Sequence, residues 1–207
     1  MRKRLVAMFA FSMMLPTAAD AQVQVPQSAR LDPGTGGPSP GSHQPLAQIY
    51  THPKNGFVVI APPGARISDK AKGQQISIRS NKGYAVNLQS GLARPDIPLA
   101  RMSALLEEKY LGDGKIWTAR TKERRLIVAG LPAYETIYVG NSMRTRVIIT
   151  RGNTNDSVFI FIAPNRHFDT LQHEFNWIVD NFKPGYEDVV AKKKPKLNIA
   201  TNQQTKC

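Results

Sequence analysis

Basic side chains recur at every second position in two segments that are rich in strand-forming residues. The first segment holds Arg120, Lys122 and Arg124, and the second holds Arg144 and Arg146. Because alternate side chains of a strand lie on one face of a sheet, each set is expected to share a face. Guanidinium groups bind phosphate and carboxylate through paired hydrogen bonds. If the two strands are close, the five cations form an anion-binding surface; the alternative is a solvated edge whose charges prevent aggregation.

The histidines are the other side chains that suggest metal chemistry. His43 and His52 lie near the start of the strand-rich region, and His167 and His173 lie near the start of a helical pattern. His167 and His173 are six residues apart, whereas a helical zinc pair is four apart. The sequence also lacks a Gly-x-Ser-x-Gly turn, a Walker loop and a glycine-rich dinucleotide turn. We therefore expect no catalytic residues, no metal, no cofactor and no enzyme activity.

Residues 1–21 have the three parts of a cleavable secretion signal. Residues 2–4 are basic, residues 5–15 are apolar, and two small residues precede a cleavage site before Gln22. The apolar stretch is too short to cross a bilayer, which takes about 20 residues. The mature protein is therefore expected to be periplasmic or secreted, with no transmembrane segment after cleavage, although peripheral membrane contact is compatible with the sequence.

The chain is strongly basic, with 28 Lys and Arg against 15 Asp and Glu and a net charge of +13. Residues 22–207 keep +11, since the signal holds three basic residues and one acidic residue. Such an excess favours an anionic partner, such as phospholipid headgroups, an envelope polymer or an acidic protein. Five lysines between residues 192 and 206 contribute to it, so the alternative is a solubility device. Nucleic acid is not an expected partner of an exported chain.

Two segments of biased composition flank the region that can fold. Residues 22–47 are rich in Gly, Pro and Ser and are expected to form a disordered linker. Residues 187–207 form a basic, disordered tail that ends in Cys207, the single cysteine, so no disulfide can form within the chain. Residues 48–186 have the length of one ordinary domain.

Apolar runs predict most of the strands of this domain. The expected strands are residues 57–61, 75–79, 84–88, 116–128 (in one or two pieces), 133–139, 144–150 and 157–163. Residues 158–162 are apolar throughout, so their strand is expected to lie centrally in the sheet with both faces covered.

Two segments instead repeat apolar residues at helical spacing. They predict one helix from Leu99 to Tyr110 and another from Phe168 to Phe182, which Pro184 ends. The two helices are able to cover both faces of the central strand. The expected fold class is therefore α/β (α+β), an antiparallel sheet with helices on both faces, or α/β/α sandwich.

This order of elements resembles the PsbP-like superfamily, in its bacterial exported branch. The resemblance covers roughly residues 50–184 and rests on the segments Gly56–Pro63, Gly130–Glu135, Phe159–Pro164 and Ile178–Phe182, with Phe168 and Phe175 between the last two. It implies a small adaptor, assembly or accessory protein with no catalytic residues. The closing pattern is also similar to C-terminal domains attached to some HExxH metallopeptidases, but this chain lacks HExxH.

The sequence thus predicts a non-enzymatic exported accessory or binding protein that engages an anionic envelope component or a partner protein. The alternative is an envelope enzyme or a detached accessory domain of a metallopeptidase system. A neighbouring gene for an HExxH protease would favour the alternative.

Export is tested by sequencing the N-terminus of the protein recovered outside the cytoplasm. We expect it to begin at Gln22 or within a few residues of it, because signal cleavage follows the small residues at positions 19 and 21. A recovered protein that still begins at Met1 contradicts the prediction.

Overall fold

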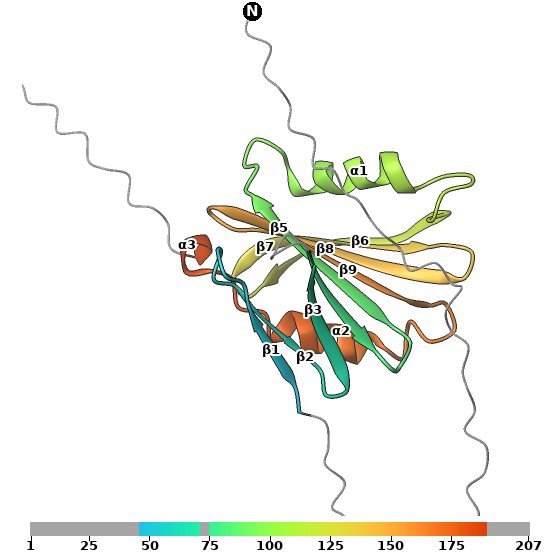
Figure 1. Ribbon diagram of the computed structural model, residues 1–207. Helices are drawn as coiled ribbons and strands as arrows, with labels where there is room; N and C mark the ends of the chain where they lie inside the picture. Colours follow the sequence, from blue (N-terminus) through green and yellow to red (C-terminus); the bar gives the residue numbers. More distant parts are fainter. Residues whose placement is uncertain (1–45, 71–74, 190–207) are drawn as a thin grey trace, which may run out of the picture. The chain divides into compact units, whose positions relative to one another are not determined.

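A computed structural model describes residues 46–70 and 75–189, which belong to one compact unit (Figure 1). The predicted signal (residues 1–21), almost all of the predicted linker, and most of the basic tail, including Cys207, lie outside the described residues.

Nine strands and three helices are formed by the described residues. The strands are β1 (Gln48–Thr51), β2 (Val58–Ala61), β3 (Ala65–Lys70), β4 (Gln75–Ser80), β5 (Ala85–Leu92), β6 (Ala119–Val128), β7 (Leu131–Val139), β8 (Met143–Arg151) and β9 (Asn155–Pro164). The helices are α1 (Leu99–Tyr110), α2 (Gln172–Asp180) and α3 (Tyr186–Val189).

Strand β9 is the middle strand of the main sheet. Seven antiparallel strands follow the order β3-β4-β5-β9-β8-β7-β6, and β1 and β2 pair separately. Every residue from Asp156 to Ala163 is buried. The continuous apolar run therefore has the place that the sequence predicts for it, because only a central strand with both faces covered buries side chains of both alternating sets.

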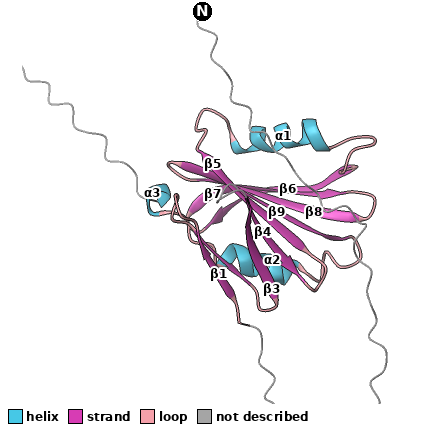
Figure 2. Cartoon of the chain, in the orientation of Figure 1, coloured by secondary structure: helices cyan, strands magenta, loops and turns pink. Residues whose placement is uncertain are grey.

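The two longer helices lie on opposite faces of this sheet (Figure 2). On one face, the ring centroid of Phe161 of β9 lies 5.0 Å from that of Phe175 of α2. On the other face, the buried Ser103 hydroxyl of α1 lies 2.9 Å from Thr136 Oγ1 and 3.0 Å from the Tyr138 hydroxyl, both on β7. This arrangement confirms the expected α/β/α sandwich.

Helix α1 leaves part of its face of the sheet uncovered. It packs mainly on β7 and β8 (Figure 1), whereas β3, β4 and β5 lie at the other end of the strand order. The pairing register gives the residues of these three strands that face the α1 side and whose side chains are described: Arg66, Ser68, Gln75, Ser77, Arg79, Ala85, Asn87 and Gln89. Apart from Ala85, this half of the face is therefore neutral polar or basic, with no carboxylate among the side chains described there.

Several elements differ from those that the sequence predicts. Strands β1 and β3 and helix α3 are additional: β1 and α3 have only four residues each, and β3 is a mostly polar edge strand. Helix α2 begins at Gln172 instead of Phe168, because residues 165–171 form turns. Strand β6 is one piece that begins at Ala119, and its register shifts between Arg120 and Lys122.

The stability of the α2 face is tested by cutting back one aromatic ring. Phe175 is fully buried against Phe161, Phe168 and Tyr84, so Phe175→Ala should lower the free energy of unfolding by about 3–5 kcal/mol in urea titrations. The matched control is Trp177→Ala on the same helix, because the Trp177 side chain is 43% exposed. Equal losses in the two variants would contradict the assigned burial.

Candidate anion-binding site

The five cations singled out in the sequence do not share one face. Arg120 pairs with Tyr138, whose ring points toward α1, but Lys122 pairs with Ile137, which points toward α2. The bulge adds one residue between them and so reverses the expected alternation. The single row expected on residues 120, 122 and 124 is therefore wrong, although Arg124 does share the α2 face with Lys122.

Carboxylates neutralise most of these cations. Arg120 Nη1 lies 3.2 Å from Glu107 Oε1 and 3.1 Å from Glu123 Oε2. Arg144 Nη1 lies 3.0 Å from Asp169 Oδ2. Lys122 is exposed and makes no ion pair with any other described residue. The surface predicted from the sequence thus has little positive charge that is not already paired.

The remaining two arginines share one buried carboxylate. Glu135 Oε2 accepts hydrogen bonds from Arg124 Nη2 at 2.8 Å and Arg146 Nη2 at 3.2 Å. Arg146 also donates from Nη1 to the side chains of Gln172 and Asn176 on α2. Burial lowers the pKa of Arg146, and the charge and hydrogen bond of Glu135 oppose that shift. This cluster holds α2 to the sheet, and we assign it a structural role.

A second buried carboxylate also has local partners. Burial alone raises the pKa of Glu174, but hydrogen bonds from Lys82 and Tyr84 outweigh burial and lower that pKa below its usual 4.5. His173 Nε2 lies 3.3 Å from the same carboxylate. Within the described ranges, no group of three or more His, Cys, Asp or Glu side chains is placed to hold a metal ion.

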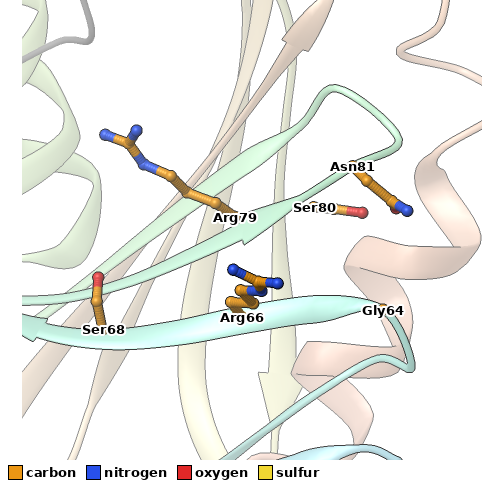
Figure 3. Close-up of a pocket in the computed structure, with 6 residues that line it drawn as sticks. All are labelled: Gly64, Arg66, Ser68, Arg79, Ser80 and Asn81. Atoms are coloured by element: carbon orange, nitrogen blue, oxygen red, sulfur yellow. The ribbon is translucent and has the colours of Figure 1, made fainter. Parts of the chain in front are cut away.

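Two arginines that the sequence pattern did not single out lie opposite each other on the uncovered part of the sheet. Arg66 of β3 pairs with Arg79 of β4, so both side chains project from the same side of these strands (Figure 3). Both are exposed, and neither forms an ion pair or side-chain hydrogen bond with another described residue. They line a pocket of about 480 Å³ together with Gly64, Ser68, Ser80 and Asn81.

Local sequence explains how this pocket is built. The Ala65 N–H donates to the Pro62 carbonyl at 3.0 Å, and Gly64 has φ +84°, as expected for a tight turn with proline second and glycine third. This turn starts β3 and sets its register. On the far side of Arg79 the paired residue of β5 is Ala85, whose small side chain leaves the Arg79 side chain uncovered.

The composition of the pocket favours an anion. Two arginines, two serines and one asparagine line it together with Gly64, and none of its lining residues carries a carboxylate. Like charges directly opposite each other destabilise an antiparallel pair. An arrangement that keeps this repulsion without a neutralising side chain is suited to a negative group from outside the chain.

The pocket escaped the sequence interpretation for a specific reason. Arg66 and Arg79 lie on different strands, and β3 has too few apolar residues to be recognised as a strand from the sequence. Without β3, no pattern places Arg66 beside Arg79. The signal that was available is the Pro-Pro-Gly turn at residues 62–64 followed by an Arg in an alternating segment.

Comparisons with known proteins support the fold. No protein-family model matches the chain, and no curated protein sequence matches it. The structure is similar to the solution structure of cyanobacterial PsbP (CyanoP) from Synechocystis, with a TM-score of 0.51, 16% identity, and coverage of 73% of this chain and 98% of that chain. The PsbP-like fold that the sequence predicts is therefore confirmed, and the likeness to metallopeptidase domains stays a prediction.

A second solved structure, from Bacteroides thetaiotaomicron, aligns with a TM-score of 0.46 and 8% identity. The alignment covers 70% of this chain and 50% of that chain.

None of the helices formed by residues 46–70 and 75–189 has the length and apolar composition needed to cross a membrane.

The structural role of Glu135 is tested by removing its charge without changing its shape. Glu135→Gln should lower the free energy of unfolding by about 3–5 kcal/mol, because Arg146 then stays buried without a counter-charge. Asp169→Asn, which breaks the exposed pair with Arg144, should cost no more than about 1 kcal/mol. Urea unfolding measures both.

A double variant checks the cause. Glu135→Gln/Arg146→Met removes both buried charges and should recover part of the stability lost in Glu135→Gln. If Glu135→Gln and Asp169→Asn are equally mild, the Glu135 cluster does not hold α2 to the sheet.

Proposed function

We propose that the mature protein, residues 22–207, is an exported, non-enzymatic accessory or binding protein that engages an anionic component of the cell envelope. The observation that carries the proposal is the pair Arg66 and Arg79, which lies on an uncovered part of the sheet with no carboxylate beside it. The five cations predicted from the sequence are weaker candidates, because four of them are paired with carboxylates.

The net charge supports an anionic partner. Residues 22–207 carry +11, so an anionic surface attracts the whole chain before any specific contact forms. Orientation then depends on which cations are not already paired. Arg66 and Arg79 meet this condition at one place in the fold, whereas the lysines of residues 190–207 add attraction that is not specific for any anion.

A binding role accounts for the polar chemistry better than a catalytic one. The buried carboxylates Glu135, Glu174, Asp156 and Asp188 all accept hydrogen bonds from the chain's own donors. The buried Tyr138 hydroxyl is likewise held by Ser103 and Glu107, and burial is the main reason that its pKa rises to about 12. None of these groups lines the pocket at Arg66 and Arg79. The pocket offers hydrogen-bond donors and positive charge, which suit recognition of a bound group.

Export is the other half of the proposal and rests on the pattern of residues 1–21. A cleaved signal delivers the basic chain to the compartment where phospholipid headgroups and envelope polymers are exposed.

The proposal is tested by binding of residues 22–207 to phosphatidylglycerol vesicles, with phosphatidylcholine vesicles as the neutral control. Exposed charge pairs contribute only about 0.2–1 kcal/mol each, so affinity must come from several acting together. Binding should therefore weaken several-fold as salt rises from 0.01 M to 0.15 M, since the screening length falls from about 30 Å to about 8 Å. Co-sedimentation measures both.

Deleting residues 190–207 should reduce binding to every anionic surface alike, because the five lysines of that segment add positive charge outside the pocket. Absence of binding at low salt, or equal binding to neutral and anionic vesicles, would contradict the proposal.

A further inference from the structure

We propose that the pocket at Arg66 and Arg79 binds a phosphate monoester group, an inference that rests on the proposed function and narrows it to one ligand chemistry. The argument uses the charge of the pocket, its donors, its size and its surroundings.

The charge of the pocket matches a dianion. Arg66 and Arg79 are paired across adjacent antiparallel strands, a geometry that places Cβ atoms about 4.5–5.5 Å apart. Each guanidinium group carries one positive charge. A phosphate monoester carries about −1.5 to −2 charges near pH 7, so one group neutralises both arginines. A carboxylate, a sulfate ester or a phosphodiester carries one negative charge. It would leave one of the two arginine charges without a counter-charge.

The donors of the pocket also match. A monoester presents three strongly accepting oxygens, and each guanidinium offers a planar fork of N–H groups. Ser68 and Asn81 lie on the two sides of the arginine pair along β3 and beyond β4 (Figure 3). The Ser68 hydroxyl donates to the Ser77 carbonyl at 3.4 Å, so the Asn81 amide is the further donor at the rim. No carboxylate lines the pocket, so no acidic side chain of the lining competes with the ligand for the arginines.

The size and surroundings leave room for the rest of the ligand. A volume of about 480 Å³ is in the range of small-ligand sites and larger than a phosphate group alone. Next to the pocket, β5 presents the half-buried, neutral polar side chains of Asn87 and Gln89. These suit a hydroxylated substituent, such as a sugar or glycerol, on the ester oxygen. The phosphate therefore belongs either to a lipid headgroup or to a soluble ester, with the same chemistry in the pocket.

The test compares two lipid headgroups and one soluble ester, using residues 22–207. Vesicles containing phosphatidic acid present a monoester, and vesicles containing phosphatidylglycerol, matched in total negative charge, present a diester. Glycerol 3-phosphate is the soluble monoester, titrated by calorimetry. We expect tighter binding to phosphatidic acid than to phosphatidylglycerol. Affinity for the monoester should also rise as pH increases through about 6, where its second proton is lost.

The decisive comparison is between two double variants that each remove two positive charges. Arg66→Gln/Arg79→Gln should weaken monoester binding by about tenfold or more, since two charge-assisted contacts are lost. The control, Lys122→Gln/Arg125→Gln, removes two charges from β6 at the opposite edge of the sheet, where neither residue makes an ion pair with another described residue. It should retain the preference for phosphatidic acid. The thermal midpoint of the first variant should not fall, because the variant removes a repulsion.

Each result has a defined reading. Binding of glycerol 3-phosphate that depends on Arg66 and Arg79 supports the site with a soluble ester as ligand, and arginine-dependent binding to phosphatidic acid vesicles alone supports it with a lipid headgroup. Equal losses in the two double variants, or equal binding to the two anionic lipids without arginine-dependent binding of glycerol 3-phosphate, overturns the monoester site but leaves the proposed function standing. No binding to any anionic vesicle overturns the proposed function, and no binding to vesicles or to glycerol 3-phosphate overturns both.

Discussion

Strand β9 needs apolar cover on both of its faces, and the rest of the fold is arranged around that need. Its residues from Asp156 to Ala163 are all buried, with Phe159 and Phe161 on one side and Ile160 and Ile162 on the other. A strand of this kind is stable only where layers cover both faces of the sheet, because an uncovered face would expose one alternating set of side chains to water. Three strands therefore flank β9 on each side, and a helix lies over each face.

The two faces are covered to different extents, and this difference creates the candidate site. On the α2 face, the aromatic cluster of Phe57, Phe159, Phe175 and Phe182 extends from the middle of the sheet to the β1–β2 pair. On the other face, α1 packs mainly on β7 and β8. Strands β3, β4 and β5 have no such cover on that side, and their described side chains there are polar apart from Ala85. Two of them are arginines that pair across adjacent strands.

The distribution of acidic residues decides which cations remain available. Glu107 and Glu123 lie beside Arg120, Asp169 lies beside Arg144, and Glu135 serves two arginines at once. These pairs belong to the half of the sheet that α1 and α2 both contact. Carboxylates are missing from the lining of the pocket on the β3–β4 side. The protein thus neutralises cations where elements pack on the sheet, and it leaves Arg66 and Arg79 unpaired side by side on the open part; the other unpaired cations of β6, Lys122 and Arg125, lie on opposite faces of their strand. This separation supports a binding role for the open side.

Local patterns in the sequence are sufficient to identify the central strand, helix α1 and the layered architecture. The apolar run at residues 158–162 and the helical repeat from Leu99 to Tyr110 are signals within one element, and burial follows the same period as the backbone.

Tertiary structure decided the rest. The bulge after Arg120 reverses the side chains that follow, and it depends on the pairing of β6 with β7. The turns before Gln172 shorten α2, although Phe168 and Leu171 keep the buried positions that their spacing indicates. The meeting of Arg66 and Arg79 depends on strand register, and the pairing of the other arginines depends on carboxylates from other segments. Such contacts join residues distant in the chain, and a periodicity within one segment carries no information about them.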